Sequence, residues 1–207
     1  MKFASANPSV VRSIRQRVLL NAWLRALRKP QAPPSLADFR PDGLADELTD
    51  MMRFSVEGDG ETARFLITQE GSRLASVFGG RRIDPIRRAH RYLHDAIGPE
   101  RYARVASCYL ECVVRRRPTY SISQVQDEAG REVSVERLLL PFGGAGGVEQ
   151  IVGSYKSISI EDRFKLNSLM GLDVCSAPLR QLDAVIDSEP APQPAHDHSA
   201  HEVVEVS

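Results

Sequence analysis

The stretch REVSVERLLLPFGGAGGVEQIVGSYKSIS, residues 131–159, decides the fold. Val133 and Val135 alternate with polar residues and lead into three consecutive leucines, Leu138 to Leu140. Apolar alternation on both sides of a glycine cluster, residues 143–147, predicts two strands joined by a turn. A run that is apolar on both faces is typical of a central strand, so we expect the rest of the chain to cover this sheet on both faces.

Two other regions of the chain show the same strand pattern. Residues 52–57 and 63–68 alternate apolar and polar side chains on either side of a Gly-Asp-Gly turn, which predicts a second hairpin. Residues 119–125 alternate again and predict a fifth strand.

Helical periodicity recurs between these strands and ahead of them as far as residue 118, with a proline-rich extended connection in residues 31–41. We expect a long helix over residues 9–29, shorter helices over 71–78 and 85–97, and a further helix that begins at Gly98-Pro99. The apolar face of this last helix is formed by Tyr102, Val105, Tyr109 and Cys112. The order of elements predicts an α+β fold: a five-stranded antiparallel sheet with helices on one face, plus an N-terminal amphipathic helix.

The chain divides into four segments by composition. We expect an amphipathic helix in residues 1–30, a folded domain in residues 31–160, a packing segment of short helices or an extended strap in residues 161–186, and a disordered acidic tail in residues 187–207.

The distribution of charge, the cysteine content and the longest apolar runs bound the class of protein and its cellular compartment. Lys plus Arg equals Asp plus Glu at 27 each, but residues 1–30 carry no acidic residue and residues 181–207 no basic one. Three cysteines do not form a disulfide framework, and no segment approaches the roughly 20 apolar residues of a membrane span. We expect a cytoplasmic protein in its reduced state.

The helix predicted for residues 9–29 has a wide apolar arc and an arginine-rich opposite face. A wide arc favours packing against protein, either the domain itself or a second copy in a homodimer. A membrane-surface helix and a nucleic-acid-binding arm are the alternatives. The residues expected at the dimer contact are Val11, Ile14, Val18, Ala22 and Trp23.

Several motifs, taken in order, resemble the PAS domain. A helix with a tryptophan (Trp23) runs into the segment Pro34 to Pro41; Phe78-Gly79 follows the second predicted strand; and a late strand carries Glu-x-Leu-Leu-Leu-Pro, residues 136–141. Over residues 18–160 the chain is similar to a family of short bacterial proteins, common in alphaproteobacteria, that consist of little beyond one PAS domain. The resemblance implies a PAS fold, which binds small molecules or cofactors between its sheet and its helices, or serves in dimerisation and docking.

A pocket between the sheet and the helices is the expected site. Its lining residues either enclose a ligand or fill the space themselves; the first arrangement implies a ligand receptor, the second a protein–protein module. The residues are Phe54, Phe65, Ile67, His90, Tyr102, Val105, Tyr109, Ile122, Leu139 and Ile151.

Two pairs of metal-ligating residue types have helical spacing. His90 and His94 lie four residues apart, and His90 follows the inward positions of its predicted helix. In a PAS-like fold this is where a haem ligand could lie, although a partly buried histidine with a satisfied hydrogen bond is the commoner case. Cys108 and Cys112 have the same spacing, and we interpret them as small buried hydrophobic residues.

Arginines crowd the helical middle and suggest an acidic ligand or partner. They are Arg81, Arg82, Arg87, Arg88, Arg91, Arg101 and Arg104, with Arg115 to Arg117 at the end of the last helix. Nucleic acid is another possible partner, a solvated face is the simpler interpretation, and docking of the acidic tail is a further hypothesis. The histidines of the tail, His196, His198 and His201, offer only a weak, unframed chelating site.

The sequence therefore predicts a PAS-like sensor or adaptor with no output domain and no enzymatic activity. It would bind a small ligand or a partner protein, and signal through protein–protein interaction. The alternative is a peripheral membrane or nucleic-acid-associated protein that uses the basic N-terminal helix.

Overall fold

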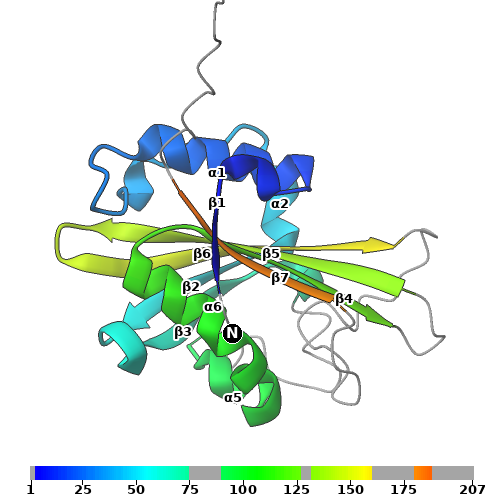
Figure 1. The fold of residues 1–207 in the computed structure, drawn as a ribbon. Helices are drawn as coiled ribbons and strands as arrows, with labels where there is room; N and C mark the ends of the chain where they lie inside the picture. Colours follow the sequence, from blue (N-terminus) through cyan, green and yellow to red (C-terminus); the bar gives the residue numbers. More distant parts are fainter. Residues whose placement is uncertain (1–2, 75–89, 127–131, 160–179, 188–207) are drawn as a thin grey trace, which may run out of the picture.

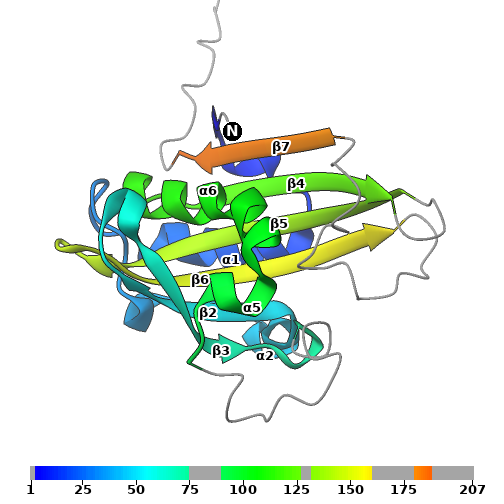
Figure 2. The same ribbon diagram turned by 90° about the horizontal axis from the view of Figure 1, so that it is seen from below.

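The structure is a computed structural model of the 207-residue chain and describes residues 3–74, 90–126, 132–159 and 180–187. Seven strands form one sheet in the order β1-β7-β4-β5-β6-β2-β3, which can be followed from top to bottom in Figure 2. The strands are β1 (Ala4–Ala6), β2 (Met51–Glu57), β3 (Arg64–Glu70), β4 (Thr119–Gln126), β5 (Glu132–Gly144), β6 (Gly147–Ser159) and β7 (Arg180–Ile186).

Five consecutive strands of this sheet, β4-β5-β6-β2-β3, are those predicted from alternation, and each pairs antiparallel with its neighbours. The long hairpin of β5 and β6 places Leu139 opposite Gly153, with the chain turning at Ala145 and Gly146. The second hairpin, β2 and β3, joins the first because β2 pairs with β6, which brings Phe54 opposite Ile151. The two hairpins therefore meet in the middle of the sheet.

The predicted number of strands is wrong. β7 pairs antiparallel with β4, and β1 pairs parallel with β7, so the sheet has seven strands and is mixed. β7 falls in the segment predicted as a packing strap, and it forms because the outer edge of β4 offers unpaired backbone groups. β1 in turn adds to the outer edge of β7, where Ala6 accepts a hydrogen bond from the backbone N–H of Asp187 at 2.9 Å.

Helices cover both faces of the sheet, as Figure 1 shows. On one face lie α1 (Ile14–Ala26) and the short α2 (Leu44–Glu47); on the other lie α5 (Leu93–Ile97) and α6 (Pro99–Arg115). The described residues also contain four single 3₁₀ turns, at Pro8–Val10, Leu36–Asp38, Leu48–Asp50 and Gly60–Thr62.

The leucine run of β5 explains this two-sided cover. Leu138 and Leu140 belong to the buried cluster beneath α1, whereas Leu139 belongs to the cluster beneath α6. The expectation of a central strand covered on both faces is confirmed, because successive side chains of a strand point to opposite faces.

The helix α1 is held against its own sheet. Ser13 caps its N-terminus by accepting a hydrogen bond from the N–H of Gln16, and the indole N–H of Trp23 donates to the carbonyl oxygen of Pro141 at 2.7 Å. Of the residues assigned to a dimer contact, Val11, Ala22 and Trp23 are buried within the chain itself. That assignment is wrong for these three residues.

The other two residues predicted at the dimer contact are not fully buried within the chain. Ile14 is 73% exposed, and Val18 is half-buried. One exposed isoleucine does not make an interface between copies, because specific interfaces bury about 800 Å² on each partner.

The helix α6 matches its prediction. It starts at Pro99, directly after Gly98 with φ of 81°, and ends at Arg115. The next residue, Arg116, has φ of 54°, the left-handed conformation of a C-terminal cap. The buried face of the helix includes Val105 and Tyr109.

The helix predicted over residues 85–97 is shorter where the structure describes it. His90 has φ of 68°, and Arg91 is not helical. Both residues pair with β3: the N–H of His90 donates to the carbonyl oxygen of Ile67, and the carbonyl oxygen of Arg91 accepts from the N–H of Ile67, each at 2.9 Å. The open edge of β3 thus overrides the helical pattern. Residues 72–74 are helical, Gly71 is not, and residues 75–78 of the predicted 71–78 helix lie outside the described residues.

Candidate functional site

Most residues of the predicted pocket come together beneath α6. Phe54, Phe65 and Ile67 from the β2–β3 hairpin meet the helix face, and the central strands β5 and β6 complete the set. The members of this buried cluster that the sequence predicted are Phe54, Phe65, Ile67, Val105, Tyr109, Leu139 and Ile151, with Tyr102 half-buried at its margin. We refer to them as the α6-face cluster.

The α6-face cluster is filled by its own side chains. The ring of Tyr109 lies 5.3 Å from that of Phe54 and 5.1 Å from that of Phe65, centroid to centroid, and its hydroxyl lies 2.6 Å from the hydroxyl of Tyr155. The Tyr155 ring folds over Gly153, where an added Cβ would lie 2.6 Å from the Tyr155 hydroxyl oxygen. Aromatic contact and hydrogen bonding therefore occupy the space between sheet and helix.

Two predicted pocket residues lie elsewhere. His90 is exposed beside β3, so the prediction of an inward haem ligand is wrong. Ile122 is buried in the cluster beneath α1. The register explains its position: Leu139 faces α6 opposite Thr119, so β4 contributes Thr119 and Ser121 to this face and Ile122 to the other.

A polar row crosses the sheet beneath α6, and the sequence reasoning missed it. Asp183 of β7 lies opposite Ser121, Ser121 lies opposite Arg137, and Arg137 lies opposite Tyr155. The signal was present in β5, where Arg137 occupies the same face as Leu139 two residues later.

Cys108 of α6 covers this row. Its sulfur lies 3.8 Å from Nη1 of Arg137 and 3.9 Å from Oδ1 of Asp183. Burial raises the pKa of the Cys108 thiol, and burial likewise raises the pKa of the Asp183 carboxyl. A thiol held in its protonated form is a poor nucleophile and a poor metal ligand.

Burial also favours the protonated form of Tyr109 and Cys112 in this interior. Burial raises the pKa of Tyr109 to about 12 and raises that of Cys112 above its ordinary value. Cys112 and Cys108 are both buried and free, which confirms them as small core residues. Within the described residues, no three His, Cys, Asp or Glu side chains are grouped so that they could hold a metal ion.

A cluster of charges joins α2 to β6 on the α1 side. Lys156 Nζ lies 2.7 Å from Oε2 of Glu47 and 2.7 Å from Oδ2 of Asp50, and both carboxylates are almost fully buried. Arg15 and Arg73 complete the cluster at 3.3 Å from Glu47 and 2.8 Å from Asp50. Because the carboxylates are paired and shielded, this cluster ties elements together and leaves no vacant charge.

Comparison with known proteins adds no further constraint. No protein-family model matches the chain, and no curated protein matches it. Among the helices in the described parts of the chain, none is both long enough and apolar enough to span a membrane.

Proposed function

We propose that the chain is a PAS-like adaptor module that acts by binding another protein. The order of its central elements supports the PAS-like part of this proposal: two strands, helices, then three strands, all paired antiparallel around β6 and β2. The proposed module has no catalytic role. We place it in a reducing compartment such as the cytoplasm, which two buried, free thiols fit.

The filled α6-face cluster is the observation that carries the proposal. A ligand receptor of this fold needs space between sheet and helices, and here Tyr109 and Tyr155 join hydroxyl groups across it at 2.6 Å. A ligand there would have to displace aromatic rings from a dense interior, at a cost of several kcal/mol. Recognition through the surface is the remaining route by which the module can signal.

The alternative, a membrane or nucleic-acid protein that uses its N-terminal helix, has less support. Leu19, Leu20 and Trp23 of α1 are buried against the sheet. A membrane could bury this face only if the helix left the fold and exposed the cluster beneath it. A homodimer remains part of the proposal only through surfaces other than this buried face.

Native mass spectrometry of the freshly purified full chain tests the proposal. We expect the mass of the polypeptide alone, 23.0 kDa or a multiple of it, with no small molecule released on unfolding. In parallel, a photo-crosslinking residue at Ile14 or Val114, both exposed, should capture a second protein in cells, compared with the same residue at exposed Arg64. One small molecule for each chain, released on unfolding, would overturn the proposal.

A further inference from the structure

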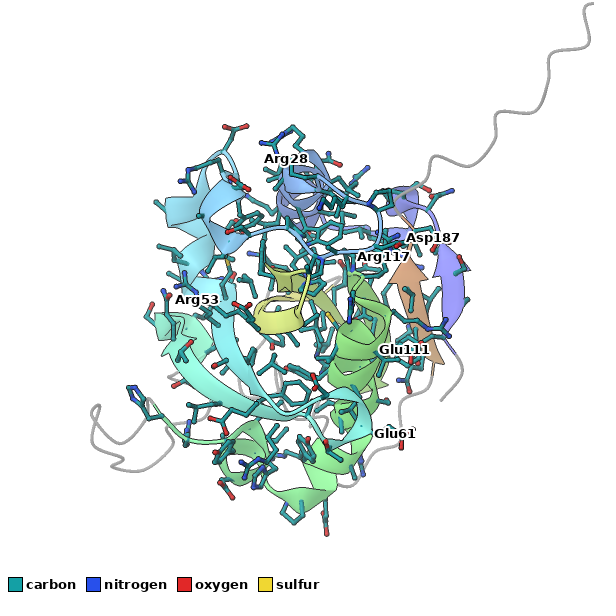
Figure 3. The ribbon with its side chains drawn as sticks, turned by 90° about the vertical axis from the view of Figure 1, so that its left-hand side faces the viewer. Arg28, Arg53, Glu61, Glu111, Arg117 and Asp187 are labelled. Atoms are coloured by element: carbon teal, nitrogen blue, oxygen red, sulfur yellow. The ribbon has the colours of Figure 1, made fainter. Side chains whose placement is uncertain are left out.

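Four unpaired cations gather at one end of the molecule. Arg28 and Lys29 follow α1, and Arg116 and Arg117 follow α6; none of the four has an ion-pair partner among the described residues. We call these four residues the basic end. Figure 3 views the molecule from this side, with Arg28 and Arg117 labelled.

The fold brings these cations together from opposite faces of the sheet. The helices α1 and α6 both terminate beside the β5–β6 turn, and Lys29, Arg116 and Ala145 of that turn line one cavity of about 310 Å³. Arg117 lines a neighbouring cavity of about 390 Å³ together with Arg115 and Asp187. The negative ends of the two helix dipoles favour cations here, but each is equivalent to only about half a charge.

The described chain ends beside the same cations. The N–H of Ile186, the last residue of β7, donates to the carbonyl of Pro118 at 2.8 Å, next to Arg117. Asp187 then lines the cavity that Arg115 and Arg117 share. The residues that follow therefore start at the basic end.

Residues 188–207 have the complementary charge. They contain Glu189, Asp197, Glu202 and Glu205, and neither lysine nor arginine. Glu189 follows Asp187 by two residues, which places it within about 7 Å of that Cα, since a chain spans at most about 3.5 Å per residue. The other three carboxylates have enough chain to reach any part of the basic end.

We propose that residues 188–207 bind the basic end of the same molecule. Each exposed ion pair contributes less than about 1 kcal/mol, but the covalent connection gives the segment an effective concentration on the order of millimolar. The contact is electrostatic, so salt weakens it. An acidic surface on another protein would have to displace residues 188–207 before it could bind. The segment therefore competes with such a partner for the basic end. This proposal does not depend on whether the α6-face cluster holds a ligand.

Carbodiimide cross-linking of the full chain tests the contact, because this reagent joins amines to carboxylates that touch. Lys29 is the one lysine of the basic end, and trypsin releases it in residues 29–53, because prolines follow Lys29 and Arg40 and block cleavage there, while residues 181–207 form a single tryptic peptide. We expect these two peptides to be joined through Lys29 and the acidic residues of the segment. The yield should fall about tenfold in 0.5 M NaCl, where the Debye length is only about 4 Å.

The matched control is the full chain with Glu189→Gln, Asp197→Asn, Glu202→Gln and Glu205→Gln, which should lose the cross-link. A mixture of ¹⁴N- and ¹⁵N-labelled chains distinguishes contact within one molecule from contact with a second copy. Links that join a ¹⁴N peptide to a ¹⁵N peptide would assign the basic end to a second copy, since contact within one molecule gives none, and absence of any link from Lys29 would overturn the proposal altogether.

Binding of a 20-base-pair DNA duplex, used as a general polyanion at low salt, provides an independent measurement. If the segment covers the basic end, the four-site control should bind the duplex about tenfold more tightly than the natural chain. Adding Arg28→Gln and Arg116→Gln to that control should remove the gain. Equal affinity of the natural chain and the control would contradict the proposal.

Discussion

The α6-face cluster and the basic end differ in whether their polar groups find partners within the described fold. Beneath α6, rings and hydroxyl groups satisfy one another, as the 2.6 Å contact of Tyr109 with Tyr155 shows. At the basic end, Lys29 and Arg116 share a cavity without an acidic partner among the described residues. The comparison teaches that the aromatic interior beneath α6 pairs its own hydroxyl groups, whereas the cations of the basic end have no ion-pair partner among the described residues.

The largest effect should come from opening the interior. Phe54→Ala removes a fully buried ring from the α6-face cluster, and we expect it to lower the free energy of unfolding by about 3–5 kcal/mol, because the packed neighbours cannot close the gap. Urea denaturation measures this loss. If the variant does not fold, Ile67→Val, with an expected loss of about 1 kcal/mol, takes its place. A loss below about 1 kcal/mol for Phe54→Ala would mean that the space is not filled.

The next effect separates a paired lysine from an unpaired one. Lys156→Met leaves the buried carboxylates of Glu47 and Asp50 without their closest cation, and we expect a loss of about 3 kcal/mol in the free energy of unfolding. The measurement is again urea denaturation. A variant as stable as the natural chain would show that the charge cluster does not hold α2 to β6.

A third prediction concerns pH. Burial raises the pKa of Tyr109 to about 12, above the value near 10 of an unfolded tyrosine. The folded state therefore retains the phenolic proton longer than the unfolded state, and the stabilisation is complete below pH 10. It is lost as the pH rises from about 10 to 12, by about 2–3 kcal/mol. Tyr109→Phe should show a smaller decline over this range in pH-dependent denaturation; an identical decline would exclude Tyr109 as its source.

The smallest effect should be at the basic end. Lys29→Met removes an exposed cation that has no described partner, so we expect the free energy of unfolding to change by less than about 0.5 kcal/mol. The same denaturation experiment measures it beside Lys156→Met. A loss comparable to that of Lys156→Met would show that Lys29 is paired within the fold, and the contrast between interior and surface would not hold.

Much of the central sheet could be predicted because its signals are local. The leucine run at 138–140 placed β5 between two layers, and alternation gave both hairpins their strands. The α6 face was predicted from its apolar spacing alone. These features depend on the spacing of apolar residues over short stretches, which a single sequence shows directly.

The errors arose where distant backbone decides the local structure. The alternation of Leu182, Ala184 and Ile186 signals a strand, but only the open edge of β4 gives this strand a partner. His90 leaves the helical pattern because β3 binds its backbone. Ile122 was assigned to the wrong face because the pairing of Thr119 with Leu139, which sets the face, is a property of the register. The expectations for residues 75–89, 161–179 and 188–207 fall on parts of the chain outside the described residues.

Thermal unfolding with and without benzene tests most directly whether the interior is filled. A small apolar molecule raises the midpoint of unfolding only when the folded state has room for it. We predict that benzene raises the midpoint of Phe54→Ala, or of Ile67→Ala if the first variant does not fold, and leaves the natural chain unchanged. A rise of equal size in the natural chain would contradict the account, because it would show that the α6-face cluster already contains an open ligand site.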